Sequence, residues 1–336
     1  MSYETYRLGD FALSSGAVLP SAIIAYKTYG ARHLPAIIYP TWFSGLISDN
    51  EWLIGEDKAL DPRRYFIIVP AMFGNGESSS PTTITAVAQA GDTPRSSSSA
   101  AASFPDVSLR DCVTAQHRLV TEHLGVRRAR CVLGWSMAAA QTYQWITQFP
   151  DFADLAVPFC GSARTSLHNS VFLEGVKVAL LAARGATSSG VMVRSQDSSA
   201  AAGWDPEERV VALKAMARVY AGWGFSQAFY RQRLYESKLG YADLEDFMQG
   251  FWEKWALSKD PANLLVMLQA WQAADCSLQP PYDGDLELAM RSIKAKTLVL
   301  PGKTDLYFPP EDSENEVRCM APGVGACLSF PSVWGH

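Results

Sequence analysis

Ser136 has the surroundings of a catalytic serine. It lies in the sequence CVLGWSMAAAQ (131–141), in which an apolar run that favours a strand leads through a tight turn into a segment that favours a helix. Such a strand–turn–helix context lifts a serine hydroxyl above the carboxyl edge of a sheet. Ala138 stands where the usual Gly-x-Ser-x-Gly pattern has its second glycine, and its small side chain still fits a sharp turn. The pattern predicts a nucleophile, with an ordinary strand-to-helix turn as the alternative.

An aspartate and a histidine follow two later apolar runs. Asp305 comes shortly after the run at 297–300, and His336 follows the run at 327–331. Each residue alone could be an ordinary turn, cap or tail residue. Together with Ser136 they have the chain order in which α/β-hydrolases supply a catalytic triad. The other histidines precede Asp305 and do not fit that order: His33, His117, His123 and His168.

These residue types predict acyl transfer through a covalent intermediate. Neutral His336 would take the proton of the Ser136 hydroxyl, and a buried Asp305 would orient the imidazole and stabilise its charged form. The oxyanion formed by attack on an ester or thioester needs backbone donors. We expect these to be the amide of Met137, directly after the nucleophile, and the amide of Trp42, in the loop after the first buried strand.

The elements around these residues predict an α/β fold with a mostly parallel, twisted sheet flanked by helices. Two early strands are expected within 11–29, and continuous apolar runs at 36–40 and 65–70 are typical of strands buried on both faces. A helix is expected at about 108–124. The helix after Ser136 should end before Pro150.

The character of the chain changes between its core strands. From 166 to 290 the helical period dominates, which predicts a lid inserted between core segments 1–165 and 291–336. Two stretches rich in serine, alanine and glycine, 91–102 and 185–203, are expected to be loops. The insertion is dense in aromatic residues, which favour an apolar pocket if they do not simply form the lid core: Trp204, Trp223, Phe229, Tyr230, Trp252, Trp255 and Trp271.

Composition narrows the class of protein. The chain has 336 residues, 48% of them hydrophobic, and a net charge of −5, without the basic runs that bind nucleic acid. The first residues lack the pattern of a secretory signal, and no apolar stretch is long enough to span a membrane. The six cysteines are scattered, without metal-site spacing. We therefore expect a cytoplasmic enzyme without a metal, a cofactor, or a nucleic-acid or membrane partner.

Several stretches resemble the homoserine O-acetyltransferase family of α/β-hydrolases. The resemblance runs from about residue 25 to 336 and is weakest across the lid. It is carried by AYKTYG (25–30), KALDPRRYF (58–66), FPDVSLRD (104–111), GWSM (134–137), SAR (162–164) and DLYFPP (305–310).

In that family a serine accepts an acetyl group from acetyl-CoA and passes it to a hydroxyl. The resemblance implies that Ser136 carries the acyl group, that Trp42 lies in the oxyanion loop, and that an acyl-CoA is a candidate co-substrate. It also implies a homodimer through the lid helices and assigns Lys177 and Arg164 to substrate binding. In the family the chain continues past the matching histidine into a further helix.

Departures from the family pattern predict that homoserine is not the acceptor. The sequence PTW (40–42) replaces a His-Ala-Leu-like oxyanion loop. Lys177 stands where homoserine-specific members have an arginine for the substrate carboxylate, and lysine lacks the bidentate fork of arginine. No acidic residue lies at 331–335, where such members hold the substrate amino group.

The sequence therefore predicts a serine-dependent O-acyltransferase or esterase/thioesterase that acts on a mid-sized, fairly apolar small molecule. Two other classes remain open. The same triad could serve carbon–carbon bond cleavage or a polyketide-type condensation, or the fold could belong to a non-catalytic interaction protein. Products formed from an acyl-CoA, with and without a hydroxyl acceptor, would separate the two enzymatic classes, and a Ser136 that does not react with fluorophosphonates would indicate the interaction protein.

Overall fold

The computed structural model describes residues 3–84, 104–184 and 204–336, so the two expected loops at 91–102 and 185–203 lie outside the described residues. In the described part, one sheet of eight strands has the order β1-β2-β4-β3-β5-β6-β7-β8. The strands are β1 (Glu4–Ala12), β2 (Val18–Tyr29), β3 (Ala36–Ile38), β4 (Phe66–Pro70), β5 (Ala129–Trp135), β6 (Ala153–Phe159), β7 (Lys296–Val299) and β8 (Gly325–Cys327).

The sheet is mostly parallel, as predicted. Strand β2 pairs antiparallel with β1 and β4, and all other neighbouring strands pair in parallel. The side chains of β3 and β4 are buried throughout, which agrees with their continuous apolar sequences. Because the strands from β3 to β8 share one direction, the loops that follow them meet at a single edge of the sheet.

Strand β8 differs from its prediction, which placed it at 327–331. The regular ladder with β7 ends at Cys327, and beyond it Phe330 forms only an isolated bridge to Gly302. The amides of Leu328 and Phe330 still donate to the carbonyls of Val299 and Pro301. The apolar run therefore follows the sheet edge without continuing the strand.

Helices pack on the sheet. Helix α3 packs against β5 and β6, α2 packs on α3, and α12 packs on β8. Their bounds are α2 (Leu109–Arg118), continued by the π-helix η2 (Leu119–His123), α3 (Met137–Gln148) and α12 (Pro310–Cys319); a 3-10 helix, η1 (Ile47–Leu53), follows β3. In α2 the N-terminal turn is closed by a capping box, because the Ser108 hydroxyl accepts from the Asp111 amide while the Asp111 carboxylate accepts from the Ser108 amide.

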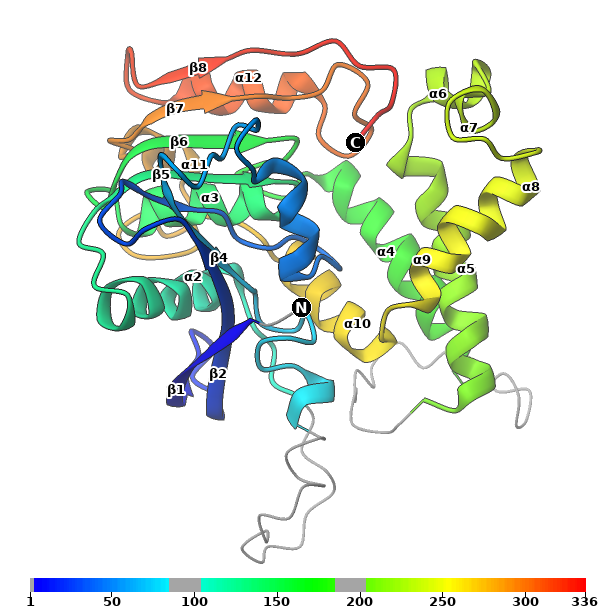
Figure 1. Cartoon of the computed structure of the whole chain (residues 1–336), viewed down its shortest axis with the longest axis horizontal. Helices are drawn as coiled ribbons and strands as arrows, with labels where there is room; N and C mark the ends of the chain where they lie inside the picture. Colours follow the sequence, from blue (N-terminus) through cyan, green and yellow to red (C-terminus); the bar gives the residue numbers. More distant parts are fainter. Residues whose placement is uncertain (1–2, 85–103, 185–203) are drawn as a thin grey trace, which may run out of the picture.

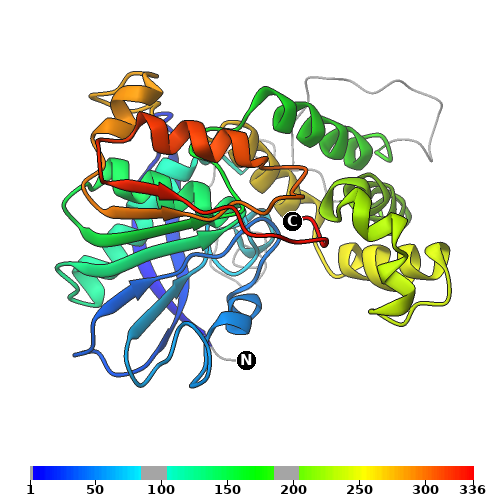
Figure 2. The same ribbon diagram turned by 90° about the horizontal axis from the view of Figure 1, so that it is seen from above.

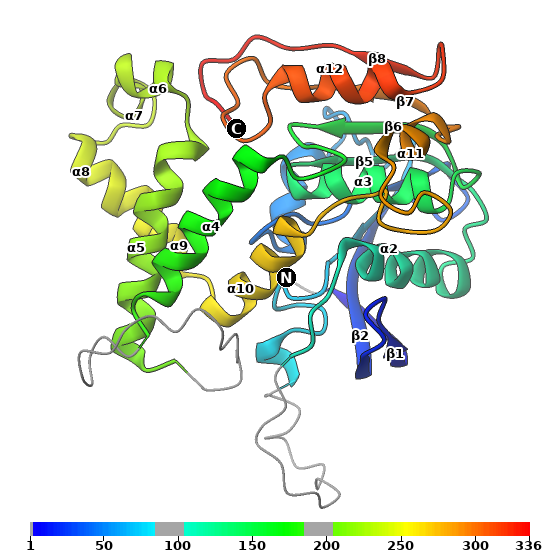
Figure 3. The ribbon, with the colours of Figure 1, turned by 180° about the vertical axis from the view of Figure 1, so that it is seen from behind.

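Between β6 and β7 the regular elements of the described residues are helices, and we call 166–291 the insertion. Its helices are α4 (Leu167–Leu181), α5 (Pro206–Gly224), α6 (Gln227–Arg231), α7 (Leu234–Ser237), α8 (Leu244–Phe247), the π-helix η3 (Met248–Glu253), α9 (Lys254–Leu257), α10 (Pro261–Gln272) and α11 (Leu286–Arg291). Figures 1 and 3 show most of them gathered beside the sheet, beyond the carboxyl ends of its parallel strands.

Two apolar clusters hold these parts together. The larger one runs from the sheet through α2 and α3 into α4, α5 and α10 of the insertion. The smaller one joins α3, β6 and β7 to α11 and α12, so α11 packs on the sheet side of the molecule, away from the other helices of the insertion (Figure 2). Among the described residues, no helix has both the length and the apolar character that a membrane span requires.

Candidate active site

Ser136 occupies a strained turn between β5 and α3. Its φ of 59° and ψ of −129° are unusual for a residue with a side chain. The turn is tight because Gly134 has no side chain: a Cβ there would lie 2.1 Å from the carbonyl oxygen of Ala138. Both Ala138 and Ser136 are buried, so the small residues of the motif make the close approach possible and place the hydroxyl at the carboxyl edge of the sheet.

The three predicted triad residues lie in one hydrogen-bonded row. His336 Nε2 is 2.8 Å from Ser136 Oγ, and His336 Nδ1 is 2.8 Å from Asp305 Oδ2. These distances are within the reach that proton transfer from serine to histidine requires. The structure therefore brings together residues that are up to 200 positions apart in the chain.

Asp305 is held by the loop between β7 and α12. Its Oδ1 accepts hydrogen bonds from the amides of Tyr307, at 2.8 Å, and Phe308, at 3.1 Å, which leaves Oδ2 for His336. The residue is only 4% exposed. The orientation of its carboxylate is thus fixed by backbone donors, and the carboxylate in turn fixes which nitrogen of the imidazole faces Ser136.

Tyr307 closes one side of the histidine. Its ring meets the imidazole of His336 edge-on, with the ring centroids 4.8 Å apart. Burial raises the pKa of the Tyr307 hydroxyl well above its ordinary value, so the phenol stays neutral beside the triad. The residue therefore packs against the base without adding charge.

Trp42 and Met137 are the two residues whose amides we expect to bind the oxyanion. Met137 is the first residue of α3, and Trp42 lies in the loop after β3 and lines the same cavity as Ser136. Neither amide has a protein acceptor within the part of the chain that the structure describes. Backbone amides without a protein acceptor can donate to a bound ligand, so the assignment of these two amides to the oxyanion stays a prediction.

The loop that carries Trp42 is tied to the insertion. The Gly45 amide donates to the Trp42 carbonyl, and the turn between them places Ser44 at a φ of 62°. Lys259, which precedes α10, donates from Nζ to the carbonyl oxygen of Ser44 at 2.9 Å. Burial lowers the pKa of the Lys259 ammonium. The insertion thus reaches the loop that carries Trp42.

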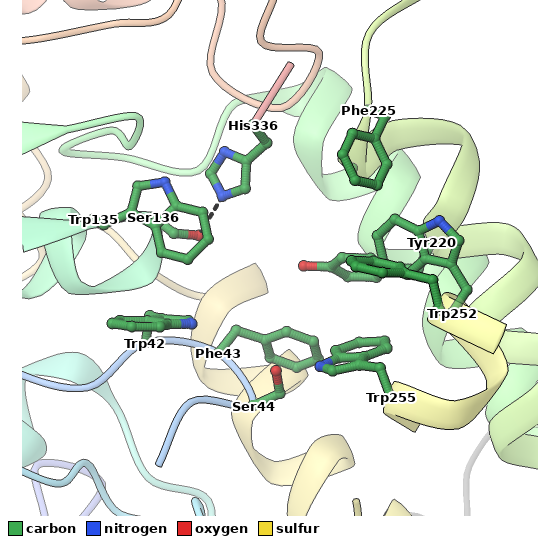
Figure 4. A pocket seen from close by; sticks show the side chains of 12 residues that line it. Trp42, Phe43, Ser44, Trp135, Ser136, Tyr220, Phe225, Trp252, Trp255 and His336 are labelled. Atoms are coloured by element: carbon green, nitrogen blue, oxygen red, sulfur yellow. Dashed lines mark hydrogen bonds between the residues drawn. The ribbon is translucent and has the colours of Figure 1, made fainter. Parts of the chain in front are cut away.

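Ser136 opens into a small aromatic cavity of about 190 Å³ between the sheet edge and the insertion (Figure 4). Figure 4 shows the Tyr220 hydroxyl pointing across the cavity toward Ser136 and His336. None of the described residues that line the cavity is an aspartate, a glutamate, a lysine or an arginine. The lining residues are Trp42, Phe43, Ser44, Trp135, Ser136, Tyr220, Gly224, Phe225, Phe251, Trp252, Trp255 and His336.

Lys177 and Arg164 are not brought to this cavity. Lys177 lies on α4, where its Nζ is 3.8 Å from the carboxylate of Glu174. Arg164 donates to Asp275, to Ser277 and to the carbonyl of Gly284, so its guanidinium is occupied by the segment that precedes α11. Neither residue is among those that line the cavity. Within the described ranges, no group of three or more potential metal ligands is present either.

Sequence reasoning missed most of the cavity wall. Only Trp252 and Trp255 of the aromatic residues singled out in the insertion line it. Tyr220, Phe225 and Phe251 were not predicted, although they belong to the same aromatic-rich segment. The high local content of aromatic residues was the one sequence feature that indicated them. Which of these rings face Ser136 depends on how α5 and η3 are oriented.

A serine, a histidine and an aspartate in this geometry, carried at the carboxyl edge of such a sheet, define a serine α/β-hydrolase. The chain is 35% identical to the ethyl acetate hydrolase of Pseudomonas veronii, over 95% of this chain and 85% of that protein. It is 27% identical to a homoserine O-acetyltransferase of Zymomonas mobilis subsp. mobilis, over 96% of this chain and 87% of that protein. No protein-family model matches the chain.

The fold is also that of a solved esterase. The crystal structure of an acetylester hydrolase from Corynebacterium glutamicum superposes with a TM-score of 0.85 at 31% identity, over 99% of this chain and 89% of that chain. The protein therefore belongs to the α/β-hydrolase superfamily, in the group that includes these esterases and the homoserine O-acetyltransferases. It is an enzyme of the hydrolase or acyltransferase class, and the alternative of a non-catalytic interaction protein is wrong.

Proposed function

We propose that the protein hydrolyses short-chain esters of neutral alcohols through an acyl-enzyme on Ser136. The observation that carries this proposal is the hydrogen-bonded row of Ser136, His336 and Asp305 at the mouth of a small, uncharged aromatic cavity. His336 takes the serine proton as Ser136 Oγ attacks the ester carbonyl, and the proton then passes to the departing alcohol. Water activated by the same imidazole releases the acid.

The size of the cavity favours a small substrate. The cavity that contains Ser136 has about 190 Å³, which lies below the range of about 300–1,000 Å³ that is usual for drug-sized ligands. A neighbouring cavity of about 450 Å³ shares Trp42, Trp135 and His336 with it. The mid-sized substrate expected from the sequence is therefore narrowed in its acyl group, which is short. The relatives named as hydrolases of ethyl acetate and of acetyl esters support this choice.

Hydrolysis has more support than transfer to homoserine or another charged acceptor. A charged substrate loses water on entering a closed site and then needs a partner of opposite charge. The described lining contains no carboxylate, ammonium or guanidinium group, because Lys177 and Arg164 bind other partners. Acyl transfer to a neutral alcohol remains compatible with the same acyl-enzyme, whereas carbon–carbon cleavage and condensation have no particular support in the site.

The test is a series of p-nitrophenyl esters with acyl chains of two to eight carbons, assayed with the wild type and with Ser136→Ala. We expect activity to be highest for the shortest chains and to fall by about 10³-fold or more in the variant, with the melting temperature preserved. Retention of more than about a tenth of the activity by Ser136→Ala would exclude the acyl-enzyme. Acetyl-CoA with added alcohols measures transfer in parallel.

The same proposal includes a homodimer formed through the insertion. On α4, the side chains of Leu167 and Val171 are 88% and 71% exposed and lie one turn apart on the same face. Val219, on the adjacent helix α5, is 37% exposed and lies next to Gly175, one turn further along the same face of α4. Large apolar side chains grouped on one surface are typical of protein interfaces.

A further inference from the structure

The last four residues of the chain are held by the insertion. Up to Ser332 the segment after β8 is bound to the core, because Thr304 Oγ1 donates to the Ser332 carbonyl. From Val333 onward, the backbone hydrogen bonds that lead to another described segment all go to residues 224–226, between α5 and α6. His336, the base of the triad, thus has its side chain on the sheet edge and its main chain on the insertion.

The contact is a short antiparallel pairing in which Phe225 bridges Gly335. The Ser226 amide donates to the Trp334 carbonyl at 3.0 Å, and the His336 amide donates to the Gly224 carbonyl at 3.3 Å. The first of these bonds lies two residues before His336, and the second is made by the His336 amide itself. The pairing therefore sets the position of the His336 Cα relative to the insertion.

Gly335 makes the close approach possible. Its φ is +101°, and a Cβ at this position would lie 2.5 Å from the Ser226 nitrogen and 2.9 Å from the Phe225 carbonyl carbon. A residue with a side chain would have to push the two segments apart. Because Gly335 has no side chain, the segment that carries His336 can lie directly against the insertion.

Ser226 connects this pairing to the helices behind it. Its Oγ donates to the Val333 carbonyl at 2.6 Å and accepts from the Phe229 amide at 3.0 Å, so it caps the N-terminus of α6 while it binds the histidine segment. The residue is 2% exposed, which keeps water from replacing these bonds. Phe225, the neighbouring residue, lines the cavity beside Ser136.

We infer that Ser226 is a positioning residue for the catalytic base: through its hydrogen bond to the Val333 carbonyl it holds the main chain of His336 at the distance from Ser136 that proton transfer requires. The inference rests on the proposed function, since it concerns the base of that reaction. The Ser226 hydroxyl bonds to no triad residue, and Ser226 does not line the cavity, so its side chain acts only through the segment 333–336.

Loss of the Ser226 hydroxyl should slow the acylation step without weakening substrate binding. A displacement of a reacting group by about 1 Å costs about 10²-fold in rate. Since the two backbone bonds of the pairing persist in Ser226→Ala, we expect a smaller effect, a fall of about tenfold in kcat with KM within about twofold. The rate at which a fluorophosphonate labels Ser136 should fall in the same proportion, because that reaction also needs His336.

The matched control is Ser166→Ala. Ser166 caps α4 by accepting from the Asn169 amide, as Ser226 caps α6, but it has no bond to the segment 333–336. Both variants lose a helix cap, so their melting temperatures should fall by similar amounts. Only Ser226→Ala should label more slowly, with the same final stoichiometry, and Ser226→Thr, which keeps a hydroxyl, should recover the rate.

The outcomes separate the two proposals. A wild type that neither hydrolyses esters nor reacts with the fluorophosphonate overturns the proposed function and this inference with it. An active wild type whose labelling rate is unchanged in Ser226→Ala, or falls equally in Ser166→Ala, overturns the inference alone. If Ser226→Ala does not fold, Ser226→Gly serves in its place, because glycine is tolerated as an N-cap but provides no hydroxyl; labelling of Ser226→Gly at the wild-type rate is again contrary to the inference.

Discussion

The indole of Trp135 lies flat against the imidazole of His336. The ring centroids are 4.9 Å apart and the planes are inclined by 20°. Trp135 directly precedes the nucleophile, and its other neighbour is the Trp42 indole, which meets it edge-on at 5.0 Å. The residue before Ser136 thus supports the base, and the same ring contacts the residue expected to bind the oxyanion.

We predict that Trp135→Leu lowers kcat by about fivefold. When His336 takes the serine proton it becomes a cation, and a cation facing an aromatic ring gains about 0.5–2 kcal/mol depending on its exposure. Leucine removes that stabilisation and the flat surface that orients the ring. The measurement is kcat for p-nitrophenyl acetate. Trp204→Leu is the control, since Trp204 lines neither of the two cavities that His336 borders, and an equal loss there would contradict the prediction.

The proposed dimer predicts that a charge on the outer face of α4 produces monomers. Leu167→Asp combined with Val171→Asp places two carboxylates on the most exposed apolar side chains of that helix. Burial of these charges in an interface would cost several kcal/mol. Light scattering after size-exclusion chromatography should give a dimer mass for the wild type and a monomer mass for the variant. Val18→Asp, on β2, is an exposed control outside the insertion; a wild type that is already monomeric at micromolar concentration rules the dimer out.

Homoserine should be a poor acyl acceptor, and Lys177→Met should leave ester hydrolysis unchanged. The reason is that Lys177 lies on α4 beside Glu174, outside the cavity lining. An ammonium left without a partner in a closed site costs several kcal/mol, a factor of about 10³ in rate. A competition assay with acetyl-CoA, L-homoserine and p-nitrophenyl acetate measures the preference. Formation of O-acetylhomoserine with kcat/KM above about 10⁴ M⁻¹s⁻¹ would refute this view of the cavity.

The sequence predicted the parts of the site that local chemistry determines. The turn around Ser136 needs small residues at fixed positions, and Asp305 and His336 follow later apolar runs, so residue type and chain order selected three residues that the structure brings into one hydrogen-bonded row. The contact between Ser226 and Val333 has no such local signature, because it exists only when α5 and α6 are placed against the end of the chain. Lys177 illustrates the same limit, since resemblance gave its position in the chain but not the face of α4 on which it lies.

The fold was predictable for a similar reason. Buried parallel strands such as β4 have continuous apolar sequences, and these located most of the sheet. The predicted position of β8 was wrong because the apolar residues after Cys327 do not pair in a regular ladder. An apolar sequence indicates that a segment is buried or contacts other segments. It does not determine where an edge strand begins and ends, because that depends on how the segment pairs with its single neighbouring strand.

The final prediction concerns Glu316, a buried carboxyl on α12. Its Oε2 accepts from the Tyr143 hydroxyl and its Oε1 from the Ala163 amide, both at 2.6 Å. Burial raises the pKa of Glu316 to about 7, although these two hydrogen bonds act in the opposite direction. In the unfolded chain the pKa returns to its ordinary value of 4.5. Between these two values the folded protein keeps a proton that the unfolded chain has lost.

The free energy of unfolding should therefore contain a contribution from Glu316 that is complete below about pH 4.5 and is lost as the pH rises to about 7. Its size is on the order of 3 kcal/mol, from 1.36 kcal/mol for each pKa unit. Glu316→Gln, which is neutral at every pH, should remove this slope, so that the variant gains stability relative to the wild type as the pH rises across that window. Urea unfolding at several pH values measures the difference. Glu314→Gln, an exposed carboxyl on the same helix, is the control; a wild-type slope that persists in Glu316→Gln would show that Glu316 does not hold the extra proton.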